Sequence, residues 1–243
     1  MSALILKLIA MTTMLIDHVG LVFFPKLRWL RLIGRVSFPL YAFMIAEGFE
    51  HTEQTGHTRK YALRLAALFL LSELPYDFGL YAAVPRLDHT NVILTLLCGL
   101  LMLAGIERVK PVYMKIGIIA LAAFAAELSH ASYGYAGVLL ILLYHLYLRH
   151  VKEKSTGLRL AALLGIGALF AGYYLCTNAH SMDPHVVYRV FRRFTWTQTG
   201  VLVSAPLLTL YNGKKGRYSP VFKWVYRLFY PLHLSVFSLM RIL

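Results

Sequence analysis

The sequence predicts an all-α membrane protein: a polytopic bundle of about nine transmembrane helices, with a range of eight to ten. Two observations lead to this prediction. Hydrophobic residues make up 58% of the 243 residues and charged residues only 15%, against about 25% charged in a typical soluble domain. The apolar residues also gather into runs close to the roughly 20 residues that a helix needs to cross a bilayer. A disordered chain, a fibrous chain and an ordinary soluble enzyme are therefore excluded.

Nine apolar stretches follow one another, and we expect each to form one span of a single integral-membrane domain covering residues 1–243. The first does not resemble a removable signal peptide, because Lys7 interrupts it and Asp17 and His18 lie inside it. Several stretches are near the short limit for spanning, which sets the range of eight to ten. In chain order the expected spans are 4–24, 29–49, 61–80, 91–106, 113–130, 133–149, 158–178, 196–211 and 221–241.

The distribution of basic residues predicts the orientation of these spans. The chain has a formal net charge of +14 from 25 Lys and Arg against 11 Asp and Glu. With nine spans, sixteen of the 25 fall on the side that holds the N-terminus and eight on the other, while Arg35 lies within a span. Because cytoplasmic loops are enriched in Lys and Arg, we expect the N-terminus in the cytoplasm. The excess charge then faces the lipid bilayer, and no nucleic-acid partner is expected.

Ionisable residues inside the expected spans are the candidates for chemistry, because an Asp or Arg near a helix centre costs about 2.5–3.5 kcal/mol on insertion scales. Asp17, His18 and Arg35 lie in neighbouring spans at similar depth, which is an expensive set for packing alone. Two polar zones are expected around them, although single members are equally explained by interhelical hydrogen bonds. The outer zone includes Asp77, Asn91 and Glu127, and the inner zone includes Glu47, His51, Arg59 and Arg64. The expected substrate-binding residues are Asp77, Asn91, Glu127 and Tyr133.

The spacing of Lys7 and His18 suggests a long ligand. Eleven residues correspond to about three helical turns, so both side chains share one face of the first span, with the imidazole about 16 Å deeper. A cation at the cytoplasmic mouth can hold phosphates while a thin arm reaches the imidazole, and coenzyme A has that shape. The alternative is an interfacial lysine that acts independently of His18.

A buried histidine that stays neutral suits a general base. We hypothesise that His18 deprotonates an amine or hydroxyl that attacks a thioester, with Arg35 stabilising the developing oxyanion. Asp17 either orients His18 or pairs with Arg35, and a covalent acetyl-histidine intermediate stays open. The sequence contains no glycine-rich phosphate loop or hydrolase motif, and no metal site is expected.

Several motifs resemble the TraX family of membrane proteins, and the resemblance runs nearly end to end. Lys7 followed after ten residues by His18 is also similar to the basic-x10-His signature of the wider acyltransferase family 3, in which the basic residue is usually arginine. The TraX-like stretches are Ile16-Asp17-His18-Val19-Gly20, Gly34-Arg35-Val36-Ser37-Phe38-Pro39, Glu47-Gly48-Phe49, Leu74-Pro75-Tyr76-Asp77, Asn91-Val92, Tyr133-Gly134-Tyr135 and Tyr230-Pro231-Leu232-His233.

The resemblance implies a multi-pass acetyltransferase of the bacterial inner membrane that uses cytoplasmic acetyl-CoA as acyl donor. The family's founding member acetylates the N-terminus of F-pilin, so the implied acceptor is a pilin-like amine, or else a glycan, lipid or small molecule near the outer face. His18 is the implied catalytic residue, supported by Asp17 and Arg35, with His233 as a second candidate. The implied donor-binding residues are Lys7, Glu47, His51, Arg59 and Arg64.

Two other function classes are left open by the residues themselves. A proton-coupled transporter or permease also needs an acid, an imidazole and a guanidinium inside its spans, and Asp17, His18 and Arg35 fit such a relay. The lack of a visible inverted repeat counts against it. A non-catalytic scaffold for pilus or secretion assembly is the third class. The release of a thiol from acetyl-CoA separates the enzyme from both.

Overall fold

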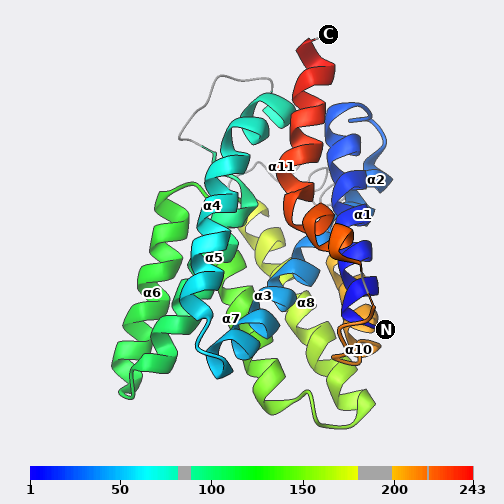
Figure 1. Ribbon diagram of the computed structural model, residues 1–243. Coiled ribbons are helices and arrows are strands. Elements are labelled where there is room, and N and C mark those ends of the chain that lie inside the picture. The colour runs from blue at the N-terminus through cyan, green and yellow to red at the C-terminus, as the bar shows by residue number, and fades with distance from the viewer. Residues whose placement is uncertain (82–88, 180–198, 218, 243) are drawn as a thin grey trace. The chain divides into compact units, whose positions relative to one another are not determined.

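The structure is a computed structural model that describes residues 1–81, 89–179, 199–217 and 219–242. Among these residues every named element is a helix, and the one β-contact is an isolated bridge between Thr90 and Ala131 (Figure 1). The predicted all-α class is therefore confirmed. The chain divides into two compact units: unit 1 comprises Met1–Tyr41 and Arg149–Tyr226, and unit 2 comprises Ala42–Leu148 and Arg227–Leu243.

Unit 1 is organised around a hairpin of two helices that pack closely. Gly20 on the first helix leaves room for the second, since a Cβ there would lie 2.6 Å from Leu30 Cβ. Later in the chain, the short 3-10 and α-helical segments that follow residue 198 pack against α8. The elements of unit 1 are α1 (Ala3–Val22), α2 (Arg28–Gly34), the start of α3 (Ser37–Gln54), α8 (Thr156–Ala179), η2 (Thr199–Val203), α10 (Ser204–Thr209) and the start of α11 (Pro220–Ile242).

Unit 2 is built around α5, which packs against both α4 and α6. Its centre comes very close to α7, because a Cβ on Gly99 would lie 2.3 Å from Ile141 Cδ1. Buried aliphatic and aromatic side chains such as Leu100, Leu103 and Tyr144 fill this core. The elements are the rest of α3, α4 (Thr58–Tyr76), the π-helix η1 (Asp77–Tyr81), α5 (Val92–Arg108), α6 (Val112–Leu128), α7 (Gly134–His150) and the rest of α11.

The second expected span, 29–49, differs from the prediction in one respect: it is not a single regular helix. α2 ends at Gly34 and α3 begins at Ser37, so Arg35 and Val36 separate two helices. Pro39 lies in the first turn of α3, where its missing N–H costs no helical hydrogen bond. Gly34 and the Ser37-x-Pro39 motif thus indicate the end of one helix and the start of the next within an apolar run.

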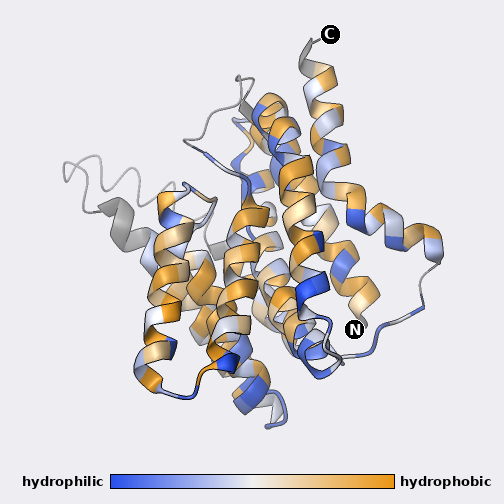
Figure 2. Ribbon diagram, turned by 60° about the vertical axis from the view of Figure 1, so that its left-hand side comes forward, coloured by the Kyte–Doolittle hydropathy of each residue, from blue (hydrophilic) through white to orange (hydrophobic). Residues whose placement is uncertain are grey.

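Three described segments are long and apolar enough to cross a membrane: Ala3–Val22, Arg28–Gln54 and Thr156–Tyr174. Most other helices follow the expected spans closely, as α5 does for 91–106 and α11 for 221–241. The expected span 196–211 differs: residues 196–198 lie outside the described residues, and residues 199–209 form η2 and the short helix α10. The number of nine spans stays a prediction. Figure 2 shows hydrophobic residues along most of the helices and hydrophilic residues gathered at their ends and in connecting segments. This is the pattern of a membrane protein.

Candidate active site

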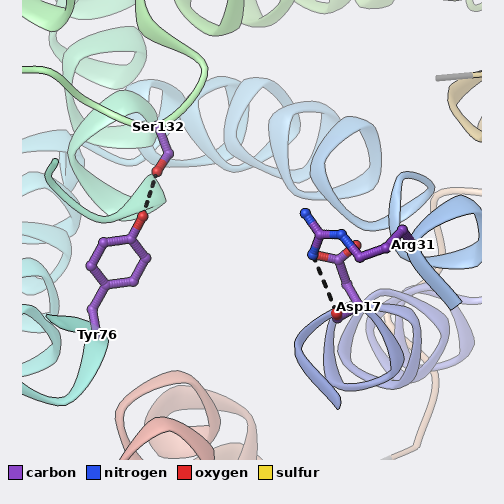
Figure 3. A network of polar contacts seen from close by, with 4 residues as sticks. All are labelled: Asp17, Arg31, Tyr76 and Ser132. Carbon is purple, nitrogen blue, oxygen red and sulfur yellow. Dashed lines mark hydrogen bonds and ion pairs between the residues drawn. The ribbon is translucent and has the colours of Figure 1, made fainter. Parts of the chain in front are cut away.

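The hairpin of α1 and α2 carries an ion pair between Asp17 and Arg31. Arg31 Nη1 donates to Asp17 Oδ2 at 2.5 Å and to the Asp17 backbone oxygen at 3.2 Å (Figure 3). The side chains are 15% and 23% exposed, so the pair is largely withdrawn from solvent. Such a charge-assisted pair, with one guanidinium nitrogen reaching both the carboxylate and the backbone of its partner, fixes one helix against the other.

Gly34 makes this arrangement possible. A Cβ at residue 34 would lie 2.2 Å from both Cβ and Oδ1 of Asp17, so a larger residue cannot occupy the position without moving the carboxylate. Asp17 Oδ1 is buried and has no hydrogen-bond partner among the described residues. It lies against the Gly34 backbone instead. The Gly34 position is therefore part of the site, although it contributes no side chain.

Arg31, and not Arg35, makes the hydrogen-bonded contact with Asp17, which differs from the alternative pairing that the sequence suggested. Both arginines are close enough to interact electrostatically with the carboxylate. Arg35 lies at the C-cap of α2, next to η2: a Cβ on Gly200 would lie 3.2 Å from Arg35 Cβ. The hairpin thus gathers two guanidinium groups around one carboxylate, immediately before His18.

Lys7 and His18 lie on α1 as expected, both partly exposed, and between them Met11 and Met14 are 7% and 6% exposed. Lys7, Met11, Met14 and His18 therefore follow one another along α1, as the spacing predicts. Lys7 Nζ lies over the ring of Tyr226, 4.6 Å from its centroid, at the beginning of α11. This cation–π contact places the ammonium group beside an aromatic residue of the same unit.

The residues of the expected outer zone that belong to unit 2 are buried or form hydrogen bonds within that unit. Asn91 is fully buried and caps α5 by accepting a hydrogen bond from the Ile93 N–H at 2.9 Å. Its amide nitrogen donates to Glu73 Oε2 at 2.5 Å and to the Phe69 carbonyl at 3.2 Å. Asp77 is buried at the first residue of η1. Asn91 therefore ties the start of α5 to α4.

A second outer network centres on Ser132, just before α7. Its hydroxyl lies 3.1 Å from the Tyr76 hydroxyl (Figure 3) and donates to the Thr90 carbonyl at 3.0 Å. The following residue, Tyr133, has φ of +72°, a conformation that is unusual outside glycine. Glu127 is exposed, and its Oε2 accepts a hydrogen bond from the Tyr135 N–H at 3.4 Å.

His233 lies in the part of α11 that belongs to unit 2 and is 8% exposed. Its Nδ1 is 2.7 Å from the Phe229 carbonyl oxygen, and its ring stacks on Phe229 with centroids 4.8 Å apart. Because a carbonyl only accepts, this contact assigns the proton to Nδ1 and leaves the lone pair on Nε2. The ring is therefore held in the tautomer that a base acting through Nε2 requires.

The expected inner residues lie at the end of α3 and the start of α4, which a short turn connects. His51, Arg59 and Arg64 are exposed, while Glu47 is partly buried within α3. Thr58 donates to Glu53 Oε2 at 2.8 Å, which closes this turn. The end of α3 also contains acidic residues, so the cations of this zone do not stand alone.

Sequence reasoning missed a buried histidine in unit 2. His145 on α7 is 1% exposed, and its two ring nitrogens face carboxylates: Nδ1 lies 2.8 Å from Glu50 Oε1 and Nε2 lies 3.4 Å from Glu107 Oε1. A neutral imidazole has one N–H, so both contacts are attractive only when an additional proton sits on the ring or on a carboxyl group. No sequence motif connects these three helices. Within the described part of the chain, no cluster of His, Cys, Asp and Glu is arranged to hold a metal ion.

Comparison with known proteins matches the family described as "TraX protein" over residues 2–241. A relative from Dichelobacter nodosus, "Probable fimbrial assembly protein FimC, serogroup H1", is 28% identical over 97% of this chain and 93% of its own length. "Protein TraX" of Escherichia coli is 26% identical over 98% of this chain and 86% of its own length. No solved structure matches.

Proposed function

Since the chain belongs to the TraX family, we propose that it is an integral-membrane acetyltransferase that moves an acetyl group from cytoplasmic acetyl-CoA to an acceptor at or near the outer face of the bacterial inner membrane. The observation that carries the proposal is the Asp17–Arg31 pair, which lies directly before His18 on a helix long enough to cross a membrane. The names of the fimbrial and TraX relatives favour a pilus-related acceptor, a pilin-like N-terminal amine, over a glycan, a lipid or a small molecule.

In the proposed reaction, His18 removes a proton from the acceptor amine as its nitrogen attacks the thioester carbonyl carbon. The C–N bond forms, the C–S bond breaks, and the proton passes from the imidazolium to the departing thiolate, which leaves as coenzyme A. Imidazole suits this exchange because its pKa lies close to neutral pH. Arg35 stabilises the negative charge that develops on the carbonyl oxygen during the attack.

Asp17 and Arg31 act in this proposal as positioning residues. Arg31 Nη1 donates both bonds to Asp17, and the proposal gives the two groups no contact with the reacting atoms. The pair instead fixes α1 against α2, which sets the position of His18 relative to Arg35. The contacts between Asp17 and Arg31 affect catalysis because a small displacement of a base or of an oxyanion donor lowers the reaction rate steeply.

The proposal also assigns the remaining polar groups. His233, with its lone pair on Nε2, is the second candidate base, and Asp77, Glu127 and Tyr133 belong to the acceptor side. Lys7 receives the donor at the cytoplasmic end of α1. This orientation needs a cytoplasmic N-terminus and two spans before His57, so a cysteine introduced at His57 should react with a thiol reagent from the cytoplasmic side alone. Reaction from the outer side contradicts the orientation.

The reaction itself is tested with the purified full-length protein in detergent. Acetyl-CoA is added together with a pilin-like peptide, or with the same peptide already acetylated at its N-terminus. We expect thiol release and peptide acetylation with the free amine and neither with the blocked peptide. A protein that neither binds nor consumes the donor contradicts the proposal. Proton uptake by reconstituted vesicles without thiol release would assign the chain to the transporter class instead.

A further inference from the structure

The start of the chain and the segment after α10 are joined by backbone hydrogen bonds within unit 1. The Ala3 N–H donates to the Lys214 carbonyl at 2.8 Å, and the Leu4 N–H donates to the Lys215 carbonyl at 3.2 Å. The N-terminal ammonium donates to the Leu210 carbonyl at 2.7 Å. In Figure 1 the N-terminus lies beside α10. These bonds fix residues 213–217, which we name the basic loop, against the first turn of α1.

The basic loop has the sequence Gly-Lys-Lys-Gly-Arg, and its two glycines determine its shape. Gly213 and Gly216 have φ of +70° and +76°, a region that other residues adopt rarely. A Cβ on Gly216 would also lie 2.8 Å from Ser2 Oγ, so the loop presses closely on the chain start. The Lys214 N–H donates to Asn212 Oδ1 at 3.1 Å. The backbone of Lys214 and Lys215 is therefore held by hydrogen bonds to the chain start and to Asn212.

The charge on the basic loop is positive, and the one acid next in sequence to these cations or to the nearby Lys152 is Glu153. No Asp or Glu occurs before Asp17 or after Asp183 in the sequence. Among the described residues, no carboxylate forms an ion pair with Lys214, Lys215 or Arg217, all of which are exposed. A further cation lies close by, because a Cβ on Gly213 would be 3.8 Å from Lys152 Nζ. A rigid group of exposed cations of this kind attracts a multiply charged anion.

The inner zone of unit 2 also carries exposed cations, but acidic residues accompany them. There, His51 lies near the end of α3, and Arg59 and Arg64 lie in the first half of α4. The acid Glu53 of α3 accepts a hydrogen bond from Thr58 at the start of α4. The basic loop has no such compensation. It also adjoins α1, the helix that carries His18, at Leu4. From Leu4 to His18 the helix rises by fourteen residues, which is about 21 Å.

We propose that the basic loop, together with Lys7 and Lys152, binds the phosphate groups of the acyl donor, namely the 3′-phosphate and diphosphate of coenzyme A. Lys7 lies one helical turn beyond Leu4 and marks the start of the path along α1. The donor's thioester is joined to these phosphates by a long thin arm, which can follow α1 towards His18. This inference rests on the proposed function, because it assumes that coenzyme A is the donor.

The test measures the affinity of the full-length protein for coenzyme A and for dephospho-coenzyme A in a neutral detergent without anionic lipid. The double variant Lys214→Ala and Lys215→Ala removes two cations, and the bonds to α1 survive because they use backbone carbonyls. Lys110→Ala with Lys115→Ala is the matched control, since it removes the same charge from unit 2. Unchanged melting temperatures establish that both variants fold.

We expect the dissociation constant of coenzyme A to rise by about tenfold or more in the basic-loop variant, because hydrogen bonds between charged groups are lost. The wild type's preference for coenzyme A over the dephospho form should shrink as well, while the control variant keeps both values. Equal affinities in the basic-loop variant and the wild type, alongside normal acetyl transfer, overturn this inference and leave the proposed function standing.

Two further outcomes separate the sources of phosphate. If phosphatidylglycerol in nanodiscs stabilises the wild type but not the basic-loop variant, and both bind coenzyme A equally, the loop is a lipid-headgroup site and the donor assignment is wrong. If the wild type itself does not bind coenzyme A, the inference and the proposed function fail together.

Discussion

Each unit contains a cluster of charged side chains, and in a membrane-spanning protein such charges need partners of opposite charge. The two clusters provide these partners in different ways. Asp17 and Arg31 join two helices that follow each other in the chain, and their side chains stay 15% and 23% exposed. Glu50, His145 and Glu107 join three helices that are distant in the sequence, around an imidazole that is 2% exposed.

The difference teaches that burial alone does not identify a catalytic histidine. Both nitrogens of His145 lie within 3.4 Å of a carboxylate oxygen and the ring is buried, so the three side chains link α3, α5 and α7. The Asp17–Arg31 pair compensates its own charges and leaves His18, the next residue, partly exposed. Under the proposed function, the comparison therefore favours His18 over His145 as the base and gives the unit 2 cluster a structural role.

The largest expected effect distinguishes the two histidines directly. His18→Ala should lower the rate of acetyl transfer by about 10²–10⁴-fold, which is the usual contribution of a general base. His145→Gln should leave the turnover of the folded protein unchanged and lower its melting temperature. Thiol release and thermal unfolding, measured on the same preparations, check both statements. The reverse result, with activity lost at His145 and kept at His18, would exchange the roles of the two clusters.

The second prediction breaks the pair in unit 1. Arg31→Met leaves the Asp17 carboxylate largely buried without its hydrogen-bonded cation, which should cost about 3 kcal/mol in unfolding free energy. Adding Asp17→Asn removes the uncompensated charge, so the double variant should regain most of this stability. Chemical denaturation in detergent, followed by circular dichroism, measures both. A double variant no more stable than Arg31→Met would mean that the pair's charge is not what stabilises the hairpin.

The sequence predicted the helices better than the contacts among them. Apolar runs and their polar ends located α5 and α11 to within two residues, because a helix in lipid must be apolar along its length. The same apolar run concealed the break between α2 and α3, since hydrophobicity there is continuous and only Gly34 and Pro39 indicate an interruption.

The partner of Asp17 illustrates why the site was only partly predictable. Arg31 and Arg35 are four residues apart and differ by about one helical turn, so sequence spacing alone does not choose between them. The choice is made by the close approach of α1 to α2 at Gly34, which is a tertiary feature. The contacts of His145 with Glu50 and Glu107 require the packing of three helices, and no local pattern indicates them.

The third prediction concerns the close approach itself. Gly34→Ala places a Cβ 2.2 Å from Asp17 Cβ, so the hairpin must open, at a cost of about 1–3 kcal/mol for overpacking. Gly165→Ala on α8 is the matched control, because a Cβ there meets nothing within 4 Å. Turnover should fall with Gly34→Ala and not with the control. Equal melting temperatures for the two variants would show that the hairpin accommodates a Cβ at residue 34 without loss of stability.

The smallest effect is expected at Asn91, whose side chain is committed to structure. Asn91→Ala removes the cap of α5, at a cost of about 1 kcal/mol. Asn91→Ser keeps an oxygen that can accept from the Ile93 N–H but loses the amide donor to Glu73, so its stability should lie between those of the wild type and the alanine variant. The KM for the acceptor should be unchanged in both, because the amide is fully buried and its donors already contact Glu73 and Phe69. A raised KM with unchanged stability would instead make Asn91 part of the acceptor site.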